Sequence, residues 1–277
     1  MEVSLPPGLH IVATPIGNLG DLSVRARETL RNASRILVED TRVTAKLLAH
    51  IGAKVPMSRY DDHSSDAERE RILAQLGSEA IALVTDAGTP LISDPGYKLV
   101  RAARAAGHAI HTVPGPSAAI AALTLAALPT DRFLFLGFLP AKTKARHDAI
   151  AEISAIRATL VIYESGPRLG DTLGALEEQL GSREAAVVRE ISKLHEECVT
   201  GRLGELAARY SNSTPKGEIV IVVGPPGEEA PVGDDELDAA IDEALSRLSP
   251  SRAAAEVAEK LGIPRKRAYA RALERSQ

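Results

Sequence analysis

The stretch that decides how this chain folds is Leu83-Val84-Thr85-Asp86-Ala87-Gly88-Thr89-Pro90-Leu91-Ile92-Ser93-Asp94-Pro95-Gly96-Tyr97. Its apolar beginning, which ends at Val84, predicts a buried strand, and the residues that follow predict a loop. Glycine lets backbone approach a ligand closely, proline reduces the freedom of a loop, and carboxylates accept hydrogen bonds from hydroxyl and amino groups. Because ligands of open α/β sheets bind beyond the carboxyl ends of the strands, this loop is a candidate ligand site.

Strand-like runs recur along the chain with amphipathic helical stretches between them. This alternation predicts an α/β protein with much parallel sheet. The expected strands are Leu9–Ala13, Ile36–Glu39, Ala80–Val84, Ile110–Val113, Phe133–Leu136, Leu160–Tyr163, Ala185–Val188 and Ile219–Val223.

Two breaks divide the chain. Pro114, Gly115 and Pro116 precede an alanine-rich helix, and residues 224–233 combine prolines and glycines in an acidic setting that is typical of a linker. We therefore expect an α/β domain over residues 1–117, a second over 118–226 and a small helical domain over 234–277. In the last of these, Gly262-Ile263-Pro264 separates two helices as in a helix-turn-helix.

Composition excludes several classes of protein. The 277 residues include 44% hydrophobic and only 3% aromatic residues, so the core is aliphatic and few rings are offered for base stacking. Cys198 is the single cysteine, which excludes an internal disulfide and fits a cytoplasmic location. We expect no metal site, because no Cys/His cluster has zinc spacing. We expect no membrane segment, because the longest apolar run, Ala118–Leu128, is too short for a bilayer.

Charge is distributed unevenly. A net charge of −4 argues against a protein that coats nucleic acid without selection. Residues 227–243 hold eight acidic residues and no basic one, whereas the final helical stretch, Arg265–Glu274, is basic with little acidic compensation of its own. We predict contacts with RNA phosphates, against the alternative of solvated helix faces, for Lys142, Lys144, Arg146, Arg265, Lys266, Arg267 and Arg271.

Four segments place turn residues directly after expected strands: Thr14–Asp21, the Asp86 loop, Pro114–Ala118 and Tyr163–Arg168. Loops of this kind converge on the carboxyl edge of a sheet and can line one cleft. None matches the dinucleotide fingerprint, the phosphate loop of P-loop proteins or the nucleophile elbow of hydrolases.

These residues carry a family resemblance. The segments Ile11–Leu19, Glu39–Arg42, Asp86–Gly96, Pro114–Ala118 and Gly137–Pro140 resemble, in matching order, a family of 16S rRNA cytidine 2'-O-methyltransferases in the tetrapyrrole methylase superfamily. The resemblance runs from about Leu9 to the C-terminus. It implies two α/β domains of the tetrapyrrole methylase type with S-adenosylmethionine between them, a helical C-terminal domain and a homodimer. The implied reaction is methylation of a cytidine ribose in the decoding region of the small ribosomal subunit.

The loops and the resemblance together name candidate site residues. Asp86 is suited to accept a hydrogen bond from the donor's amino group or ribose, Gly88 and Gly115 to let the backbone pass close, and Ile92 and Ala118 to form apolar walls. The full donor set is Pro15, Gly17, Asp86, Ala87, Gly88, Thr89, Ile92, Pro114, Gly115, Ser117, Ala118, Tyr163 and Glu164. Catalytic candidates, among which the sequence does not identify the base, are Glu39, Arg42, Glu164, Arg189, Glu190 and Lys193.

Two segments depart from the family pattern. Gly166-Pro167 stands where the family usually has Pro/Thr-His, and Ser64-Ser65 stands where it tends to have Asn-Glu. The contacts that the usual residues make there therefore do not transfer to this chain.

Two other functions compete with this interpretation. One keeps the superfamily and changes the acceptor to a tetrapyrrole or a protein side chain; the Thr14–Asp21 and Thr89–Pro95 segments and the basic tail weigh against it. The other is a ligand-sensing protein that binds DNA through its C-terminal helices, and the negative net charge weighs against it.

Overall fold

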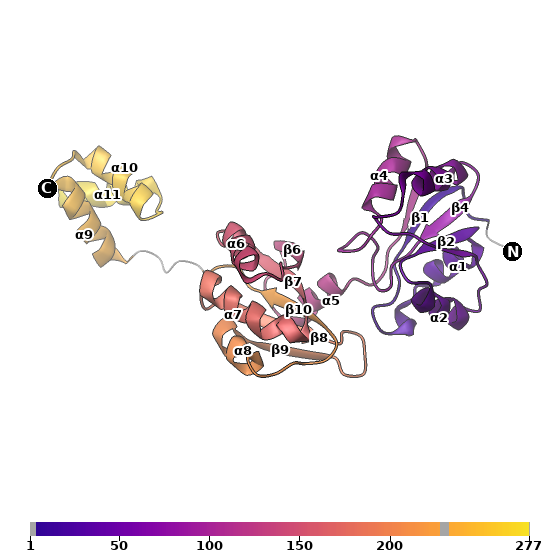
Figure 1. Ribbon diagram of the computed structural model, residues 1–277. Helices are drawn as coiled ribbons and strands as arrows, with labels where there is room; N and C mark the ends of the chain where they lie inside the picture. Colours follow the sequence, from indigo (N-terminus) through magenta and orange to yellow (C-terminus); the bar gives the residue numbers. More distant parts are fainter. Residues whose placement is uncertain (1–3, 228–232, 277) are drawn as a thin grey trace. The chain divides into compact units, whose positions relative to one another are not determined.

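The computed structural model describes residues 4–227 and 233–276, so part of the expected linker lies outside the described residues. The chain forms two compact units, Met1–Pro225 and Pro226–Gln277 (Figure 1). The first unit contains both sheets. No helix within the described ranges is long and apolar enough to span a membrane.

The N-terminal sheet is entirely parallel, with strand order β3-β2-β4-β1-β5. Its strands are β1 (Gly8–Val12), β2 (Arg35–Val38), β3 (Met57–Arg59), β4 (Ala80–Leu83) and β5 (Ile110–Val113). Helices connect them, as parallel strands require. They are α1 (Val24–Asn32), α2 (Thr41–Ile51), α3 (Asp66–Leu76) and α4 (Tyr97–Ala105), with the short 3-10 turn η1 (Leu19–Asp21).

Both faces of this sheet are buried, which explains its nearly continuous apolar strands. Ile36 and Val38 pack with α1 and α2 on one face, whereas Leu37 packs with α3 and α4 on the other. Figure 1 shows these two helix pairs on opposite sides of the strands. The carboxyl ends of β1, β2, β4 and β5 are left free to carry loops.

The second sheet has the order β6-β7-β10-β8-β9, and only β6 and β7 run parallel. Its strands are β6 (Phe133–Phe138), β7 (Thr159–Ser165), β8 (Glu184–Arg189), β9 (Glu197–Arg202) and β10 (Glu218–Val223). The prediction of much parallel sheet is thus correct for the first sheet and wrong for the second. A short connection over residues 190–196 makes β8 and β9 an antiparallel hairpin, and β10 inserts antiparallel between β7 and β8.

The helices of this half divide between the two faces of its sheet. On one face lie α6 (Thr143–Ile153), α7 (Leu169–Leu180), which follows the turn η2 (Gly166–Arg168), and α8 (Leu203–Tyr210). Within the described residues, one helix packs on the other face, α5 (Ala118–Leu125), together with Ile16 of the loop after β1. That single small helix leaves room for a cavity beside it.

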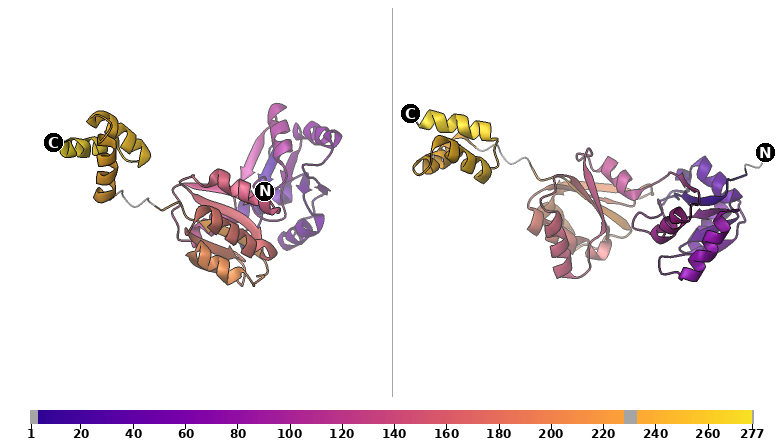
Figure 2. Two further views of the ribbon diagram at one scale, coloured as in Figure 1. Left: turned by 60° about the vertical axis from the view of Figure 1, so that its left-hand side comes forward. Right: turned by 90° about the horizontal axis from the view of Figure 1, so that it is seen from above.

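The C-terminal unit is a three-helix cluster of α9 (Asp234–Leu245), α10 (Pro250–Lys260) and α11 (Arg265–Arg275). Its core is built on alanines, among them Ala253, Ala254, Ala268 and Ala272, whose small side chains let the helices approach closely. Gly262 has φ 62° in the turn between α10 and α11, a left-handed conformation that favours glycine. Figure 2 shows the three helices from two further sides.

Gly166 shows how tightly the second half of the first unit packs. A Cβ atom at this position would overlap the carbonyl oxygen of Pro215, whereas a Cβ at Gly174 would meet no atom within 4 Å. Backbone cannot give way as a flexible side chain can. The glycine at position 166, which departs from the family pattern, thus permits close contact between η2 and Pro215.

We expect Gly166→Ala to destabilise the first unit by about 1–3 kcal/mol, because backbone must move to admit the methyl group. Gly174→Ala, on the exposed face of α7, is the matched control and is expected to gain about 0.5–1 kcal/mol from reduced chain entropy. Thermal unfolding followed by circular dichroism measures both. Equal melting temperatures for the two variants would contradict the packing argument.

Candidate active site

Backbone hydrogen bonds tie the loops at the carboxyl edge of the N-terminal sheet to one another. Thr14 and Gly88 form a two-way bridge, with Thr14 N donating to Gly88 O at 2.8 Å and Gly88 N to Thr14 O at 3.1 Å. Gly88 adopts φ 83°. Thr89 Oγ1 donates to the carbonyl of Pro116 at 2.9 Å. The loops after β1, β4 and β5 are therefore one connected structure.

Two loops at the site hold strained backbone. Leu91 and Ser93 have φ 74° and 62° in the loop after β4, and Glu190 and Ser192 have φ 52° and 66° in the β8–β9 hairpin. A left-handed conformation costs a non-glycine residue on the order of 1 kcal/mol or more, and such strain gathers at functional sites. The surrounding contacts must offset this free-energy cost to keep the two loops in the observed conformation.

A cavity of about 450 Å³ lies where the loop after β4 meets the second sheet. Ligand pockets of small molecules begin at about 300 Å³. Apolar walls come from both halves of the unit, and they are Ile16, Ile92, Ala118, Ile191, Ile219 and Val220. Phe138 and Tyr163 also line it and pack edge to face with ring centroids 5.6 Å apart. A second cavity of about 330 Å³ shares part of its lining with this one. We call the first the larger cavity and the second the smaller cavity.

Five carboxylates line the larger cavity, and three of them, Glu39, Asp86 and Asp94, belong to the N-terminal half of the unit. Glu39 Oε2 accepts a hydrogen bond from Thr85 Oγ1 at 3.1 Å, and Asp86 Oδ1 accepts one from the backbone N–H of Asp40 at 3.1 Å. Burial, together with the nearby charges of Glu39 and Asp86, raises the pKa of Asp94 to about 6. The cluster therefore favours a cationic ligand.

Glu164 faces the same cavity, but its carboxylate is held by its own neighbours. It accepts hydrogen bonds from Thr172 Oγ1 at 2.6 Å and from the backbone of Ser165 at 2.8 Å, and Arg168 Nε lies 3.3 Å from it. Its side chain is fully buried. These contacts make Glu164 a structural group more than a free base.

Arg42, a catalytic candidate, lines neither the larger cavity nor the smaller one beside it. Its side chain is 86% exposed and pairs with Asp40, whose carboxylate also caps the start of α2. Hydrogen bonds from Arg42 lower the pKa of Asp40 to about 2. The pair orders the start of α2 beside the site.

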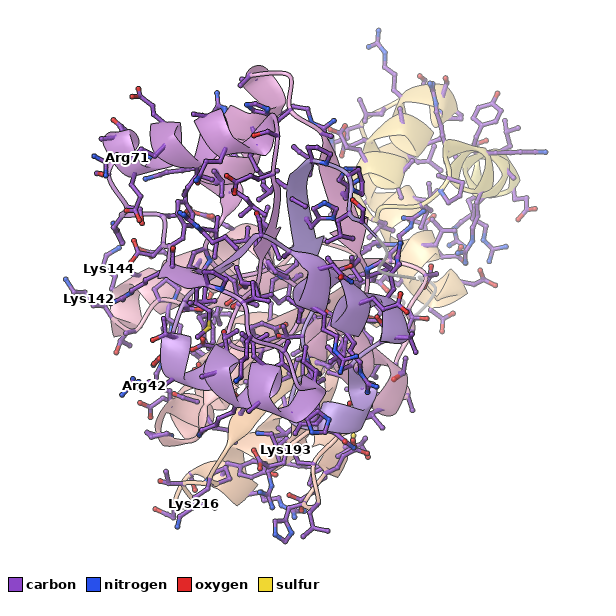
Figure 3. All side chains as sticks on the ribbon, turned by 90° about the vertical axis from the view of Figure 1, so that its right-hand side faces the viewer. Arg42, Arg71, Lys142, Lys144, Lys193 and Lys216 are labelled. Carbon is purple, nitrogen blue, oxygen red and sulfur yellow. The ribbon has the colours of Figure 1, made fainter. Side chains whose placement is uncertain are left out.

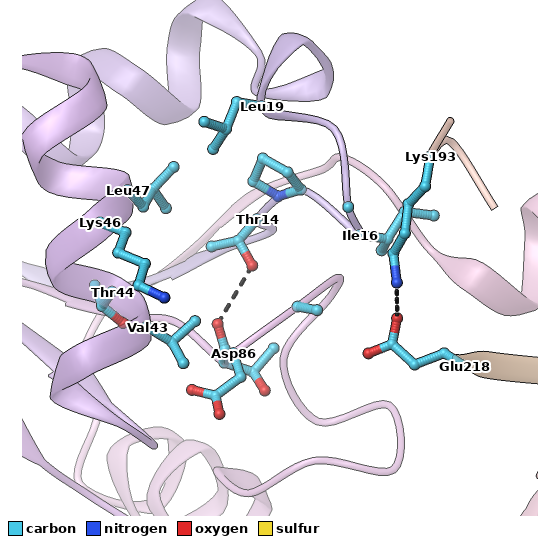
Figure 4. A pocket seen from close by; sticks show the side chains of 14 residues that line it. Thr14, Ile16, Leu19, Val43, Thr44, Lys46, Leu47, Asp86, Lys193 and Glu218 are labelled. Carbon is cyan, nitrogen blue, oxygen red and sulfur yellow. Dashed lines mark hydrogen bonds and ion pairs between the residues drawn. The ribbon is translucent and has the colours of Figure 1, made fainter. Parts of the chain in front are cut away.

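The β8–β9 hairpin contributes the remaining catalytic candidates. Arg189 pairs with Glu197 on the neighbouring strand at 2.5 Å. Lys193 Nζ lies between two carboxylates, 3.0 Å from Glu190 Oε1 and 2.8 Å from Glu218 Oε2. Glu190 and Arg189 line neither cavity, whereas Lys193 lines the smaller one (Figure 4).

The structure divides the predicted donor residues among three places. Most line the larger cavity, and they are Asp86, Ala87, Gly88, Thr89, Ile92, Ser117, Ala118, Tyr163 and Glu164. Pro15 and Gly17 instead line the smaller cavity of about 330 Å³. Gly115 lies against Ala13, where an added Cβ would be 2.9 Å from the alanine Cβ, and Pro114 lines neither cavity. Gly115 thus permits two loops to touch.

Sequence reasoning missed the contribution of β10. Glu218, Ile219 and Val220 line the larger cavity, and Glu218 also lines the smaller one. They stand at the beginning of their strand, whereas the carboxyl-edge rule searches strand ends. Because β10 runs antiparallel to β7, its beginning lies beside the end of β7, with Glu218 paired to Ser165. Knowing that β10 runs antiparallel to β7 would have been enough to identify these three residues as part of the site.

The two serines that depart from the family pattern both have local roles. Ser64 Oγ accepts a hydrogen bond from the backbone of Asp61 at 3.1 Å, and Ser65 Oγ caps α3 by accepting from Glu68 N at 3.2 Å. Neither serine lines either cavity. The substitution therefore serves the turn before α3.

Of the basic residues predicted to contact RNA on α6, two are available and one is not. Lys142 and Lys144 are exposed, and Lys144 pairs with Asp148 at 2.7 Å. Figure 3 shows both at the left of the view, with Arg42 below them. Arg146 is only 5% exposed. The prediction that Arg146 contacts phosphate is corrected, because its side chain belongs to the interior.

The expectation that the last helix lacks acidic compensation is also wrong, because α9 supplies it. Arg267 pairs with Asp234 at 3.1 Å, and Arg271 pairs with Asp238. Arg275 pairs with Asp238 and Asp242. Glu228 and Glu229, counted in the same acidic run, lie outside the described residues.

These ion pairs leave few free cations on α11. Arg265 and Lys266, in its first turn, make no ion pair with any residue in 4–227 or 233–276. Hydrogen bonds from Arg271 lower the pKa of Asp238, so this pairing is retained down to acidic pH. Arg271 thus chiefly holds α11 against α9 through its ion pair with Asp238.

Within the described residues, no group of three or more His, Cys, Asp or Glu side chains is arranged to hold a metal ion.

Comparisons with known proteins agree with this architecture. Residues 8–207 match the family model described as Tetrapyrrole (Corrin/Porphyrin) Methylases, and residues 231–276 match one described as RsmI C-terminal HTH domain. Among solved structures, diphthine synthase is similar with a TM-score of 0.62 and 16% identity, over 78% of this chain and 89% of that one. Uroporphyrin-III-C-methyltransferase from Thermus thermophilus is similar with a TM-score of 0.56 and 22% identity, over 78% and 93%.

Curated relatives match over nearly their whole length. Ribosomal RNA small subunit methyltransferase I of Erythrobacter litoralis is 54% identical, over 98% of this chain and 96% of the relative. The protein of the same name from Escherichia coli O157:H7 is 44% identical, over 96% and 94%. With its two-sheet unit, its loop-lined cavity and its helical C-terminal unit, the chain belongs to the tetrapyrrole methylase family and, within it, to the ribosomal RNA small subunit methyltransferase I family.

Proposed function

We propose that this protein transfers a methyl group from S-adenosylmethionine to a ribose 2'-hydroxyl of a cytidine in 16S rRNA of the small ribosomal subunit. The observation that carries the proposal is the larger cavity, in which carboxylates and apolar walls meet beside the loop after β4. Membership of a methyltransferase family over the whole chain supports it. The relatives' names favour rRNA over a tetrapyrrole, a protein side chain or duplex DNA as the target.

The residues of the larger cavity fit this donor. S-adenosylmethionine combines an apolar ring system with ribose hydroxyls, a sulfonium and an ammonium group. Ile92, Ala118 and Val220 suit the ring, while Glu39, Asp86 and Asp94 suit the hydroxyls and the positive charges. The backbone of Gly88, held by its bridge to Thr14, suits close approach.

The bound donor would supply an electrophilic methyl group, and the chain would supply position. Placing an acceptor oxygen close to the methyl carbon and in line with the breaking bond accounts for much of the acceleration in such displacements. Of the acidic catalytic candidates, Glu39 and Glu164 line the larger cavity. Both carboxylate oxygens of Glu164 accept hydrogen bonds, whereas within the described residues only Oε2 of Glu39 does. We propose that Glu39 acts there on the donor, whereas Glu164, Glu190 and Arg189 hold the site in shape.

For the RNA, we propose a basic surface on each unit. Lys142 and Lys144 are exposed on α6, and Arg265 and Lys266, at the start of α11, form no ion pair with any described residue. Phosphate contacts position nucleic acid and do not require a positive net charge of the whole chain. The homodimer that the resemblance implies and the cytoplasmic location that the single cysteine fits stay predictions.

We expect the purified protein to transfer label from S-adenosylmethionine to small subunits taken from cells that lack this modification. Digestion of their RNA should yield labelled 2'-O-methylcytidine. Small subunits that are already methylated are the matched control and should accept no label. Label on a porphyrin precursor or on a ribosomal protein, with none on RNA, would overturn the proposal.

Donor affinity should rise with pH, because Asp94 becomes negative as the pH passes its raised pKa of about 6. Below that pH the carboxyl is neutral and attracts a cation less. We expect the Kd of S-adenosylmethionine to fall by roughly three- to tenfold between pH 5 and pH 7.5, measured by isothermal titration calorimetry. Asp94→Asn should abolish this pH dependence, and a variant with an unchanged profile would contradict the role of Asp94.

The two kinds of arginine on α11 should behave differently. Arg265→Ala combined with Lys266→Ala is expected to weaken binding to small-subunit RNA and to lower the slope of log K against log salt by about one to two. Arg271→Ala should instead expose the amide protons of α11 to faster hydrogen exchange, because it breaks the pairing with Asp238. This division would be contradicted if the double variant and Arg271→Ala showed similar hydrogen exchange in α11. It would also be contradicted if both bound small-subunit RNA with equal affinity.

A further inference from the structure

The smaller cavity shares a wall with the larger one. Its lining comes from residues 14–19, from α2, from the loop after β4 and from Lys193 and Glu218. Five residues line both cavities: Ile16, Thr85, Asp86, Ala87 and Glu218. A ligand in one cavity would therefore lie against a ligand in the other.

The chemistry of the smaller cavity differs from that of its neighbour. It lacks Glu39 and Asp94, and beside the shared carboxylates Asp86 and Glu218 it has two lysines, Lys46 and Lys193. Figure 4 shows these lysines on opposite sides, with Asp86 between them. Lysines repel a cationic ligand and attract an anionic one. The methyl donor, which carries a sulfonium group, suits the larger cavity, and an anion suits the smaller.

Lys193 and Lys46 differ in how free they are. Lys193 is neutralised by Glu190 and Glu218, and its aliphatic stem covers Gly17, where an added Cβ would lie 2.5 Å from Lys193 Cγ. Lys46 Nζ makes no hydrogen bond or ion pair with any residue that the structure describes. Lys46 is thus the cation of this cavity that is free to take a phosphate.

The remaining walls suit a planar base. Leu19, Val43 and Leu47 form an apolar side, and Pro15 and Ile16 continue it. The volume of about 330 Å³ lies in the range of small-molecule pockets. Apolar walls beside a single free ammonium group match a nucleotide better than a porphyrin or a peptide carboxylate.

We propose that the smaller cavity is the acceptor pocket: it holds the nucleotide that is methylated, with Lys46 on a phosphate and Val43 and Leu47 against the base. This rests on the proposed function. The ribose would then meet the donor at the shared wall, near Thr85 and Asp86. There the hydroxyl oxygen forms the new bond to the methyl carbon, the carbon–sulfur bond breaks with its electron pair left on sulfur, and the hydroxyl proton passes to water.

The proposal changes the role of two predicted donor residues. Pro15 and Gly17 line the acceptor pocket and not the larger cavity. They bind the acceptor side in this scheme, and Lys193 becomes a residue that closes the pocket over Gly17.

Two substitutions test the acceptor pocket in the full-length protein. Val43→Trp fills it from the exposed side of α2, and Lys46→Gln removes its free charge. We expect Val43→Trp to reduce methyl transfer to small subunits at least about tenfold while the Kd for S-adenosylmethionine changes less than about twofold. Lys46→Gln should raise KM for small subunits about fivefold and lower the salt slope of kcat/KM by about one.

Matched controls separate these effects from general ones. Val24→Trp places the same side chain on an exposed position of α1, and Lys54→Gln removes a charge from an exposed residue that lines neither cavity. Both should methylate as the unaltered protein does. Circular dichroism checks that every variant is folded.

The outcomes divide cleanly. Full transfer by Val43→Trp, or equal effects of Lys46→Gln and Lys54→Gln, would overturn the acceptor pocket and leave the proposed function standing. Loss of donor binding in Val43→Trp would place the donor in this cavity and would also overturn it. Failure of the unaltered protein to methylate any small subunit would instead refute the proposed function.

Discussion

The two-way backbone bridge between Thr14 and Gly88 is the contact on which the rest of the site depends. It joins the loop after β1 to the loop after β4, and Thr89 extends the connection to the loop after β5. Without it, a segment rich in glycine and proline would have few internal contacts to offset its ordering entropy. With it, both cavities acquire a common wall, because Asp86 and Ala87 directly precede the bridged glycine.

Electrostatics then makes the two cavities suited to the different ligands that we propose for them. Glu39 and Asp94 make the larger one suitable for a cation, while Lys46 gives the smaller one a free positive charge. Holding a partly buried carboxylate such as Asp94 beside two others is unfavourable in an empty pocket. A cationic ligand relieves that repulsion, so the same feature that costs stability favours binding. The strained residues Leu91 and Ser93 belong to the same loop.

The C-terminal unit uses charge for a different purpose. Its acidic α9 and basic α11 neutralise each other across a core of small alanines. A small unit with little apolar surface to bury gains directional contacts from such pairs, although each exposed pair contributes little by itself. The cations left over at the start of α11 are the ones that remain for a phosphate backbone.

Much of this architecture was predictable from the chain, and the failures have physical causes. The buried strands were found because burial demands apolar runs. The edge strands β3 and β9 were missed because β3 has only three residues and polar residues interrupt β9. Sequence order predicted which loops follow strands, but not that β10 would reverse and bring Glu218 to the site. Nor did local charge counts reveal that Asp238 would reach Arg271 from another helix.

The sequence by itself determined the two α/β halves, the helical tail and the loop at Asp86, because hydrophobic periodicity and turn chemistry are local properties. Only the tertiary structure decided which charged side chains are available to a ligand and which are buried or paired within the fold. Glu164, Arg146 and Arg271 look like functional groups along the chain, yet burial and ion pairing engage them in the fold. Lys46 attracts no notice in the sequence, yet it lines a cavity and pairs with none of the residues that the structure describes, because partners and burial are set by residues distant in the chain.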